Sequence, residues 1–372
     1  MRTLPLDSLI VRRFRAFREL HIPALARVNL ITGKNNVGKS SLLEALWIYA
    51  RRGSPSALLQ VLTYRDESRR SPVRGEEGSE EQSLAFRYLY FGRKDIRLPV
   101  EPIEIGPVNS PDNMLSIGIG WYALQMSESG RRDLLPINLD ELNTVENPVL
   151  GLKIQNGTQE PINQRIDSLL ERRPLSRTLL EIKGIPTVLV PANGLDSSQI
   201  ADFWDSVSLT PLEDDVLALL RIIAPEVERI NLIGDQELSS RNRTPIVKIS
   251  GVDAPIPLRS LGEGMNRIFG LALALVNAKE GILLVDEIES GLHYSVHLKV
   301  WQLIFQVASR LNIQIVATSH SWDSIEAFQE AANQDPENGL LIRLSRKGED
   351  IIPTLFSEDE LAVATRDHIE VR

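Results

Sequence analysis

Residues 28–41 read Val-Asn-Leu-Ile-Thr-Gly-Lys-Asn-Asn-Val-Gly-Lys-Ser-Ser, and this segment is the strongest indication of the architecture. The apolar run at its start predicts a strand over residues 27–32 that ends at Gly33. Residues 39–52 place apolar side chains at mostly helical spacing, and Gly53 is a plausible stop. The loop between strand and helix fits the phosphate-loop pattern G-x-x-x-x-G-K-[ST].

The loop supplies the groups that binding of a nucleoside triphosphate such as ATP requires. Its glycines allow backbone amides to surround the phosphates, Lys39 can reach the outer phosphates, and Ser40 can coordinate Mg²⁺. A glycine turn with a solvated lysine is the alternative, but a strand before and a helix after the loop favour nucleotide binding. The predicted nucleotide-binding residues are Gly33, Lys34, Asn35, Asn36, Val37, Gly38, Lys39, Ser40 and Ser41.

A second apolar run, residues 282–285, ends in the adjacent carboxylates Asp286 and Glu287. Such a run is typical of a strand buried on both faces, whose carboxyl end faces the ligand crevice. Asp286 is suited to Mg²⁺, directly or through water, and Glu287 to polarising the water that attacks the γ-phosphate. On its own, the pair could also be an acidic helix N-terminus that favours the macrodipole.

Two weaker motifs lie on either side of this strand. A serine- and glycine-containing turn precedes an apolar helix expected over residues 265–278, so it can form a second anion-binding surface or an ordinary helix cap. Its residues are Ser260, Leu261, Gly262, Glu263 and Gly264. Thr318, Ser319 and His320 follow an expected strand over residues 314–318, where a lone histidine is often structural.

Composition restricts the class of protein. The 372 residues are 42% hydrophobic, which is ample for a packed core, and the absence of cysteine excludes disulfides and thiolate zinc sites. A net charge of -9 argues against nucleic-acid binding through bulk electrostatics, so DNA contact would have to be local. With no long apolar run and no signal-peptide pattern, we expect a cytoplasmic protein without a membrane segment.

The rest of the chain predicts an α/β architecture with an inserted region. We expect residues 1–52 to form the N-terminal part of an ATPase head, 53–250 a β lobe and a mainly helical or mixed arm, and 251–372 the C-terminal part of the head. Prolines throughout the middle argue against a long coiled coil.

Within these regions, apolar spacing and turn residues predict the individual elements. We expect a strand over 9–15, a turn near 17–20, a charged surface loop over 53–83 and an antiparallel β lobe over 84–155. Further along, we expect helices near 164–180, 197–207, 211–224 and 294–310, and a strand over 187–191.

The order of the motifs resembles that of ABC-type ATPases: phosphate loop, Ser260–Gly264 turn, Asp286-Glu287, Ser290-Gly291-Leu292 and His320. More narrowly, residues 11–17, the Asn35-Asn36 loop and residues 286–293 and 369–372 resemble the OLD-like (overcoming lysogenization defect) ATPases, relatives of SMC and RecF heads. The resemblance therefore implies a P-loop NTPase head of ABC type.

The resemblance also implies a homodimer, or a higher oligomer, joined head to tail. Ser260, Gly262 and Gly264 of one chain would close over the nucleotide held by the partner's loop. Ser290, Gly291 and Leu292 would form a dimer loop, and His320 would sense the γ-phosphate.

One element of the family pattern is not visible in the sequence. The family has a magnesium-contacting glutamine at a strand end, which we expect around residues 84–91, and neither Gln60 nor Gln82 fits that position. The second protein contact to Mg²⁺ is therefore unassigned. His293 and His297 have zinc-compatible spacing, but Tyr294 replaces the glutamate of a metalloprotease pattern.

These observations favour an ATPase whose nucleotide-dependent dimerisation switches a partner in DNA maintenance, DNA repair or antiviral defence. The alternative is a non-catalytic or very slow nucleotide-binding scaffold that regulates a separate nuclease. A built-in TOPRIM nuclease is not expected, since residues 321–372 are too short for one. A transporter motor is disfavoured by the long insert and the missing glutamine.

Overall fold

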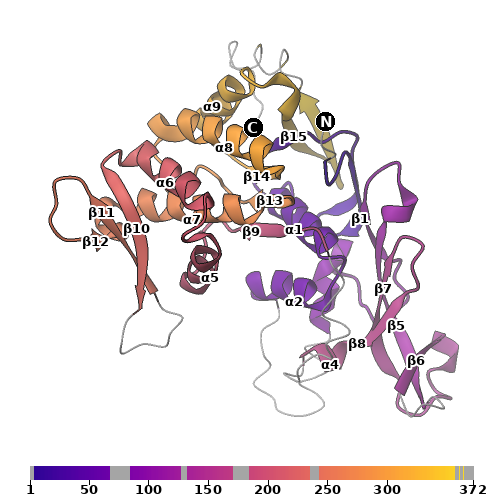
Figure 1. Ribbon diagram of the computed structural model, residues 1–372. Helices are drawn as coiled ribbons and strands as arrows, with labels where there is room; N and C mark the ends of the chain where they lie inside the picture. The colour runs from indigo at the N-terminus through magenta and orange to yellow at the C-terminus, as the bar shows by residue number, and fades with distance from the viewer. Residues whose placement is uncertain are drawn as a thin grey trace.

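The structure is a computed structural model that describes residues 4–67, 84–126, 132–170, 184–234 and 243–356, together with Glu360 and Val363. Figure 1 shows a central α/β layer with a β-rich lobe on one side and a smaller helix-and-sheet lobe on the other. The expected α/β class with an antiparallel β lobe is confirmed.

The central sheet has the strand order β16-β15-β3-β14-β13-β9. All neighbouring strands run parallel except β16, which pairs antiparallel with β15. Parallel strands place their carboxyl ends along one edge, where α/β proteins bind ligands. The strands are β3 (Val28–Thr32), β9 (Thr187–Val190), β13 (Ile282–Val285), β14 (Gln314–Thr318), β15 (Gly339–Lys347) and β16 (Asp350–Phe356).

Alternate side chains of the central strands enter two different hydrophobic cores. In β13, Leu283 and Val285 pack into one core, whereas Ile282 and Leu284 pack into the other. Burial on both faces explains why this strand reads as an unbroken apolar run. The helices around the sheet are α1 (Lys39–Ala50), α7 (Glu263–Asn277), α8 (His297–Leu311) and α9 (Trp322–Ala332).

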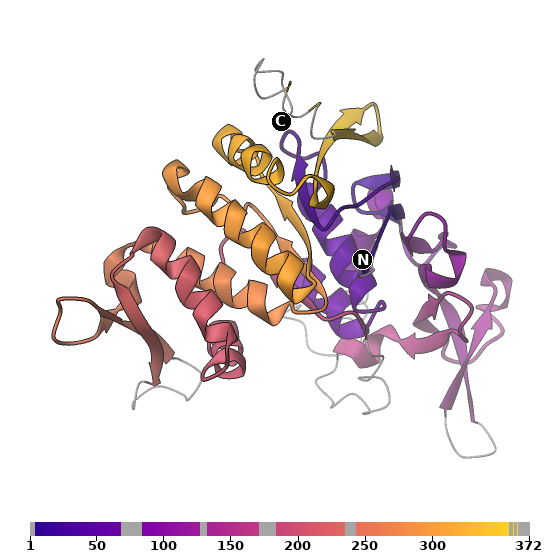
Figure 2. The ribbon, with the colours of Figure 1, turned by 45° about the horizontal axis from the view of Figure 1, so that its top comes forward.

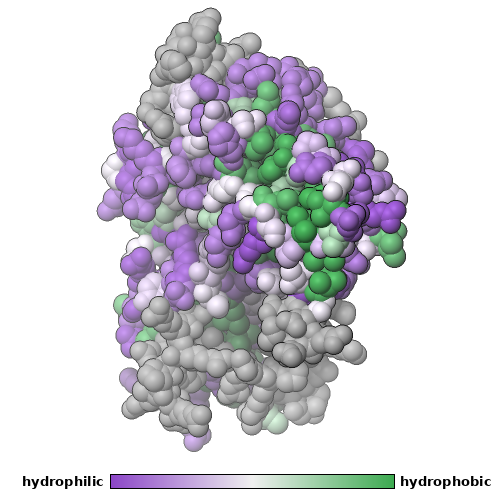
Figure 3. Space-filling view, turned by 90° about the vertical axis from the view of Figure 1, so that its left-hand side faces the viewer, coloured by the Kyte–Doolittle hydropathy of each residue, from purple (hydrophilic) through white to green (hydrophobic). Residues whose placement is uncertain are grey.

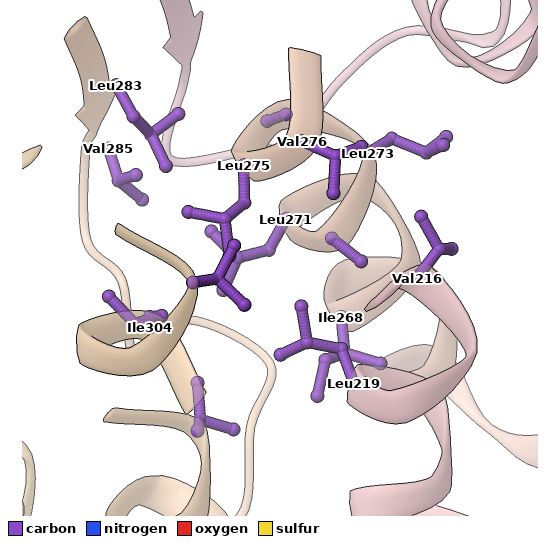
Figure 4. Packing of buried hydrophobic residues seen from close by; sticks show 14 of the residues in the cluster. Val216, Leu219, Ile268, Leu271, Leu273, Leu275, Val276, Leu283, Val285 and Ile304 are labelled. Carbon is purple, nitrogen blue, oxygen red and sulfur yellow. The ribbon is translucent and has the colours of Figure 1, made fainter. Parts of the chain in front are cut away.

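Helix α7 lies in the middle of the first core. Figure 4 shows Leu271 and Leu275 of α7 on the side of Leu283 and Val285, while Ile268 lies near Leu219 of α6 (Leu212–Ile223). The helix is apolar over most of its surface because it packs on the sheet and on neighbouring helices. The positions of α7 and β13 are thus coupled through shared packing.

The expected antiparallel lobe is present and is larger than the sequence indicated. Its sheet has the order β2-β1-β4-β5-β7-β8, with β6 paired to β5, and Figure 2 shows its β5 to β7 part extending away from the central layer. The strands are β1 (Leu9–Phe14), β2 (Phe17–Ile22), β4 (Ile103–Gly106), β5 (Leu115–Met126), β6 (Arg132–Ile137), β7 (Val149–Asn156) and β8 (Ile162–Arg165).

The expected turn near residues 17–20 is wrong, because Phe17–Ile22 forms strand β2. Its Phe17, Leu20 and Ile22 are buried, while Arg18 and Glu19 are exposed. The burial pattern is not strictly alternating, because the adjacent residues Arg18 and Glu19 are both exposed, and the sequence therefore lacks a clear strand pattern here. The actual turn lies one step earlier, at Arg15 and Ala16, where Arg15 has a φ of 47°.

The expected surface loop over 53–83 is also wrong in its first part. Pro55–Tyr64 forms helix α2, with Pro55 in its first turn and Leu58, Val61 and Leu62 buried against the second core. The helical spacing of these apolar residues is short, and the charged residues that follow it led to the prediction of a loop. Residues 68–83 of the predicted loop lie outside the described residues.

In the middle of the chain, α5 (Ser197–Val207) and α6 agree with the expected helices, and β9 with the expected strand. Of the helix expected near 164–180, α4 (Ile166–Leu170) is described, and residues 171–183 lie outside the described part. The α7, β13, α8 and β14 elements follow the predicted order. None of the described helices is long and apolar enough to cross a membrane.

The sequence reading missed an antiparallel sheet after α6. It consists of β10 (Val227–Gly234), β11 (Arg243–Ile249) and β12 (Ile256–Pro257) in that order. Figure 3 looks onto the side of the molecule where this sheet and α6 lie and shows a hydrophobic area among hydrophilic surroundings. Leu209, before α6, is 97% exposed.

Candidate functional site

A cavity of about 650 Å³ lies beside the carboxyl ends of β3 and β13. The phosphate loop forms one wall, and Asp286 and Glu287 line it from the end of β13. The residues from the loop and α1 in its lining are Asn35, Asn36, Gly38, Lys39, Ser40 and Ser41. The structure thus brings together two motifs that are far apart in the sequence.

The conformation of the phosphate loop requires its glycines. Gly33 has a φ of 139°, and a Cβ there would meet the carbonyl oxygen of Leu344. Gly38 has a φ of 93°, and its Cβ would lie 2.9 Å from the ring of Phe17. Only glycine adopts such angles without strain. The antiparallel lobe and β15 therefore press directly against the loop.

Lys39 begins α1 and folds back over the loop. Its Nζ donates to the carbonyl oxygens of Gly33 at 2.6 Å and Lys34 at 3.3 Å. Burial lowers the pKa of the Lys39 ammonium, and the nearby charges of Asp286 and Glu287 oppose that shift. The ammonium is thus held at the loop, between its carbonyls and the two carboxylates.

The Asp286-Glu287 turn is positioned by the neighbouring strand β14. Thr318, which is fully buried, donates its hydroxyl proton to Asp286 Oδ1 at 2.6 Å. The same hydroxyl oxygen accepts the backbone N–H of Glu287 at 2.9 Å. Glu287 has a φ of 49°, a left-handed conformation that is uncommon for glutamate and that turns the chain sharply at the strand end.

Arg267 of α7 also holds the Asp286-Glu287 turn in place. Its guanidinium donates to the carbonyl oxygens of Asp286 and Glu287, each at 3.0 Å, and to that of Pro191 at 2.9 Å. Burial lowers the pKa of Arg267, and the carboxylates around it oppose the shift. The sequence did not indicate this residue, which follows the Ser260–Gly264 turn by less than one helical turn and joins it to the backbone of the Asp286-Glu287 turn.

A buried ionic network closes the other side of the cavity. Glu44 of α1 contacts Arg15 Nε at 2.6 Å and Arg65 Nε at 2.6 Å, and Arg15 also pairs with both carboxylate oxygens of Glu67. Burial raises the pKa of Glu44, while the charges of Arg15 and Arg65 lower it. In the sequence, this network is indicated only by a glutamate, Glu44, among the apolar residues of α1.

The densest basic run of the chain, residues 12–18, is matched by acidic partners. Arg12 and Arg13 both pair with Glu104, and Arg18 pairs with Asp350. Arg15 belongs to the network with Glu44. The arginine charges are therefore balanced by carboxylates of the same chain.

The Ser260–Gly264 turn and the dimer-loop residues lie together on a different surface. Ser260, Gly262 and Glu263 are exposed, and Gly262, with a φ of 103°, begins α7. A Cβ on Gly264 would come 3.0 Å from the Gly291 carbonyl oxygen, so the two segments touch. None of the five turn residues is among the described residues that line the phosphate-loop cavity.

His320 follows β14 and is 56% exposed in its side chain. Its Nδ1 lies 3.8 Å from Glu287 Oε1 and 3.2 Å from Glu289 Oε1. The predicted sensor is therefore next to the predicted general base. The role of Glu289 had not been considered in the sequence.

The region where we looked for the missing glutamine has another structure. Residues Ala85–Leu89 form a 3₁₀ helix, and Gln60 lies in α2 beside a separate cavity. Gln82 is outside the described residues. On the side of β13 away from β14 the neighbouring strand is β9, which is followed by Pro191, Ala192 and Asn193 rather than by a glutamine. Among the described residues, no group of three or more His, Cys, Asp or Glu side chains forms a metal cluster.

Comparison with known proteins agrees with this architecture. The family model described as "AAA domain, putative AbiEii toxin, Type IV TA system" matches residues 207–354, and that described as "AAA domain" matches residues 8–86. The second match contains β3 and the phosphate loop, the first contains β13 to β15 and the Asp286-Glu287 turn, and β9 lies outside both.

Curated relatives and a solved structure extend the similarity. An "ATP/GTP phosphatase" of Helicobacter pylori is 21% identical, over 96% of each chain. The "Uncharacterized protein MJECL11" of Methanocaldococcus jannaschii is 31% identical over 26% of this chain and 85% of its own length. An SMC head bound to the C-terminal winged-helix domain of ScpA superposes with a TM-score of 0.50 and 13% identity, covering 95% of this chain and 98% of that chain.

The phosphate loop facing the carboxylate turn, the two AAA-domain matches and the shared head fold lead to one assignment. The chain has the fold of an SMC head with a phosphate-loop motif at its nucleotide-binding edge, and it belongs to one family with MJECL11.

Proposed function

We propose that this chain binds ATP with Mg²⁺ and hydrolyses it in a head-to-tail homodimer, and that dimerisation switches the state of a partner. The observation that supports this best is that Lys39, Ser40, Asp286 and Glu287 line one cavity. Phosphoryl transfer to water needs a phosphate cradle, a metal site and a group that orients water, and these residues offer all three.

The side chains present suit Mg²⁺. Ser40 and Asp286 offer hydroxyl and carboxylate oxygens, the donors that Mg²⁺ prefers, with room for the waters it retains. When bound, the ion would neutralise charge on the phosphate oxygens. Amides of residues 33–41 and the Lys39 ammonium would hold the triphosphate, and Glu287 would accept a proton from the attacking water.

The single chain supplies an incomplete site, which supports dimerisation. The exposed residues Ser260, Gly262 and Glu263 of the Ser260–Gly264 turn lie on a surface away from the chain's own phosphate loop. A second copy placed head to tail would bring Ser260, Gly262 and Gly264 over the bound nucleotide, with Ser290, Gly291 and Leu292 at the contact. Such an arrangement makes hydrolysis depend on assembly.

The biological role that we propose is cytoplasmic DNA maintenance or anti-phage defence, as in the OLD-like ATPases that the chain resembles. Support for a protein partner comes from the SMC head, which is bound to ScpA. A separate nuclease is the partner that fits the OLD-like resemblance. Because the arginines of residues 12–18 are paired with carboxylates, DNA would have to bind elsewhere or through the assembled dimer.

The test measures ATP hydrolysis and assembly size together, for wild type and Glu287→Gln, with and without DNA. We expect wild type to release phosphate and the variant to lose turnover by about 100-fold or more while it retains ATP as a stable dimer. Glu228→Gln, an exposed change on β10, serves as the matched control and should behave as wild type.

Two results would overturn parts of the proposal. If neither wild type nor the control hydrolyses ATP, the catalytic assignment is wrong and a nucleotide-binding scaffold takes its place. If turnover occurs at full rate in a monomer, the head-to-tail dimer is wrong while the ATPase assignment stands.

A further inference from the structure

Two carboxylates flank one nitrogen of the predicted sensor histidine. His320 Nδ1 lies 3.2 Å from Glu289 Oε1 and 3.8 Å from Glu287 Oε1. Only the first distance is within the ordinary range of a hydrogen bond. Glu289 Oε1 also accepts the backbone N–H of His320 at 2.9 Å, so this carboxylate contacts both the main chain and the ring.

Glu289 is unusual among the acidic groups of this site because it is nearly buried. Its side chain is 9% exposed, compared with 43% for Glu287, and its second oxygen, Oε2, is buried without a hydrogen-bond partner. A buried carboxylate is costly unless nearby positive charges or donors favour it. Arg267 and Lys39 lie close enough for their charges to attract it.

Both segments that form the contact are fixed by backbone hydrogen bonds. In the turn after β13, the Glu289 carbonyl accepts from Leu292 N at 3.0 Å, and the Glu287 carbonyl accepts from Ser290 N at 2.9 Å. On the other side, Ser319 N donates to the Ile31 carbonyl at 3.0 Å. The Glu289 carboxylate therefore meets His320 at a defined position.

We propose that Glu289 is a positioning residue that holds the Nδ1–H of His320, a role that rests on the proposed function of this site. Holding that proton leaves Nε2 facing the γ-phosphate, and Nε2 donates to a phosphate oxygen when the ring carries a proton on both nitrogens. It also keeps the imidazole from pairing with Glu287, whose carboxylate remains free to orient water. One buried carboxylate thus separates the sensor from the general base.

The first test observes the imidazole directly in the nucleotide-free protein. The five histidines are labelled with ¹⁵N, His320 is assigned from the His320→Gln variant, and spectra are recorded at roughly pH 9, where an ordinary imidazole is neutral. We expect the Nδ1–H tautomer in wild type and in Glu289→Gln, whose amide oxygen still accepts. Glu289→Ala should shift His320 to the Nε2–H tautomer.

An unchanged tautomer in Glu289→Ala, or the Nε2–H tautomer in wild type, overturns the proposal. Since no nucleotide is present, this result stands whether or not the protein hydrolyses ATP. It therefore separates a failure of the positioning role from a failure of the ATPase assignment.

The second test is kinetic. Glu289→Ala should lower kcat for ATP by about 10-fold with little change in KM, since the contact acts on the reacting groups rather than on nucleotide binding. Glu289→Gln should restore most of the rate, and Glu330→Ala, an exposed change on α9, should have no effect. Equal losses in the Ala and Gln variants would contradict positioning through the ring proton.

Discussion

The hydroxyl of Thr318 joins Asp286 to the backbone of Glu287, donating to the carboxylate at 2.6 Å and accepting the N–H at 2.9 Å. Thr318 belongs to β14 and the two acids follow β13, so the contact crosses between adjacent parallel strands. A single side chain thereby fixes both the carboxylate proposed to bind Mg²⁺ and the sharp turn that directs Glu287.

Replacing Thr318 with Val should disturb this turn without changing side-chain shape. Valine leaves the Glu287 N–H and the Asp286 carboxylate without their buried partner, which costs about 1–3 kcal/mol in the free energy of unfolding. Urea unfolding should show this loss, whereas Thr318→Ser should retain most of the stability. A Val variant as stable as wild type would show that water replaces the hydroxyl.

Mixing two inactive variants should recover activity if sites are shared between chains. Lys39→Met removes the phosphate-loop ammonium, and Ser260→Arg blocks the turn proposed to act on the partner. In a mixed dimer one site combines the intact loop of one chain with the intact turn of the other. Random mixing should then restore about a quarter of the wild-type rate per chain.

The readout of this experiment is phosphate release after equal amounts of the two variants are mixed. Mixing Lys39→Met with Lys39→Ala is the negative control, since no intact loop is present. Failure to recover activity from two folded, dimeric variants would count against catalysis in trans.

Removing Glu44 should be strongly destabilising. Arg15, whose side chain is 5% exposed, would lose one of its two acidic partners, and Arg65 would lose its contact as well. Leaving a buried ion without its partner costs about 3–5 kcal/mol. Denaturant unfolding of Glu44→Ala should show a loss of this size, and Glu19→Ala, which removes an exposed partner of Arg12, should change little.

His297 should make stability depend on pH. Burial lowers the pKa of this imidazole in the folded protein, so the unfolded chain binds the proton more readily. The contribution of neutral His297 to the free energy of unfolding is fully present above the ordinary pKa near 6.5. It is lost as the pH falls from there through the lowered pKa of the folded protein. The slope is at most about 1.4 kcal/mol per pH unit.

The measurement compares urea unfolding of wild type and His297→Asn between pH 8 and pH 5. The stability difference between them should shrink toward acid pH, because asparagine does not titrate. His21→Asn, at an exposed position on β2, is the control and should follow wild type. Parallel curves for wild type and His297→Asn would contradict a neutral buried imidazole.

Local sequence patterns were enough for the elements around the phosphate loop. A strand before Gly33, a helix from Lys39 and the apolar run before Asp286 all have signals within a few residues. The patterns gave wrong predictions where charged residues lie in or next to a segment with buried apolar side chains. The sequence predicts a turn at β2 and a loop at α2, although Phe17 and Leu58 are fully buried. Both elements are stabilised by packing against the second core, and a short segment of sequence does not show which distant residues form that core.

By itself, then, the sequence determined the chemistry of the site: a glycine loop with Lys39 and Ser40, and two carboxylates after a buried strand. How these groups are held in place follows from the folded structure alone. Thr318, Arg267 and Glu289 reach the carboxylate turn and His320 from β14, α7 and the turn itself. Such contacts depend on the order of the strands in the sheet and on the packing of helices from distant segments. Neither can be derived from the spacing of residues along the chain.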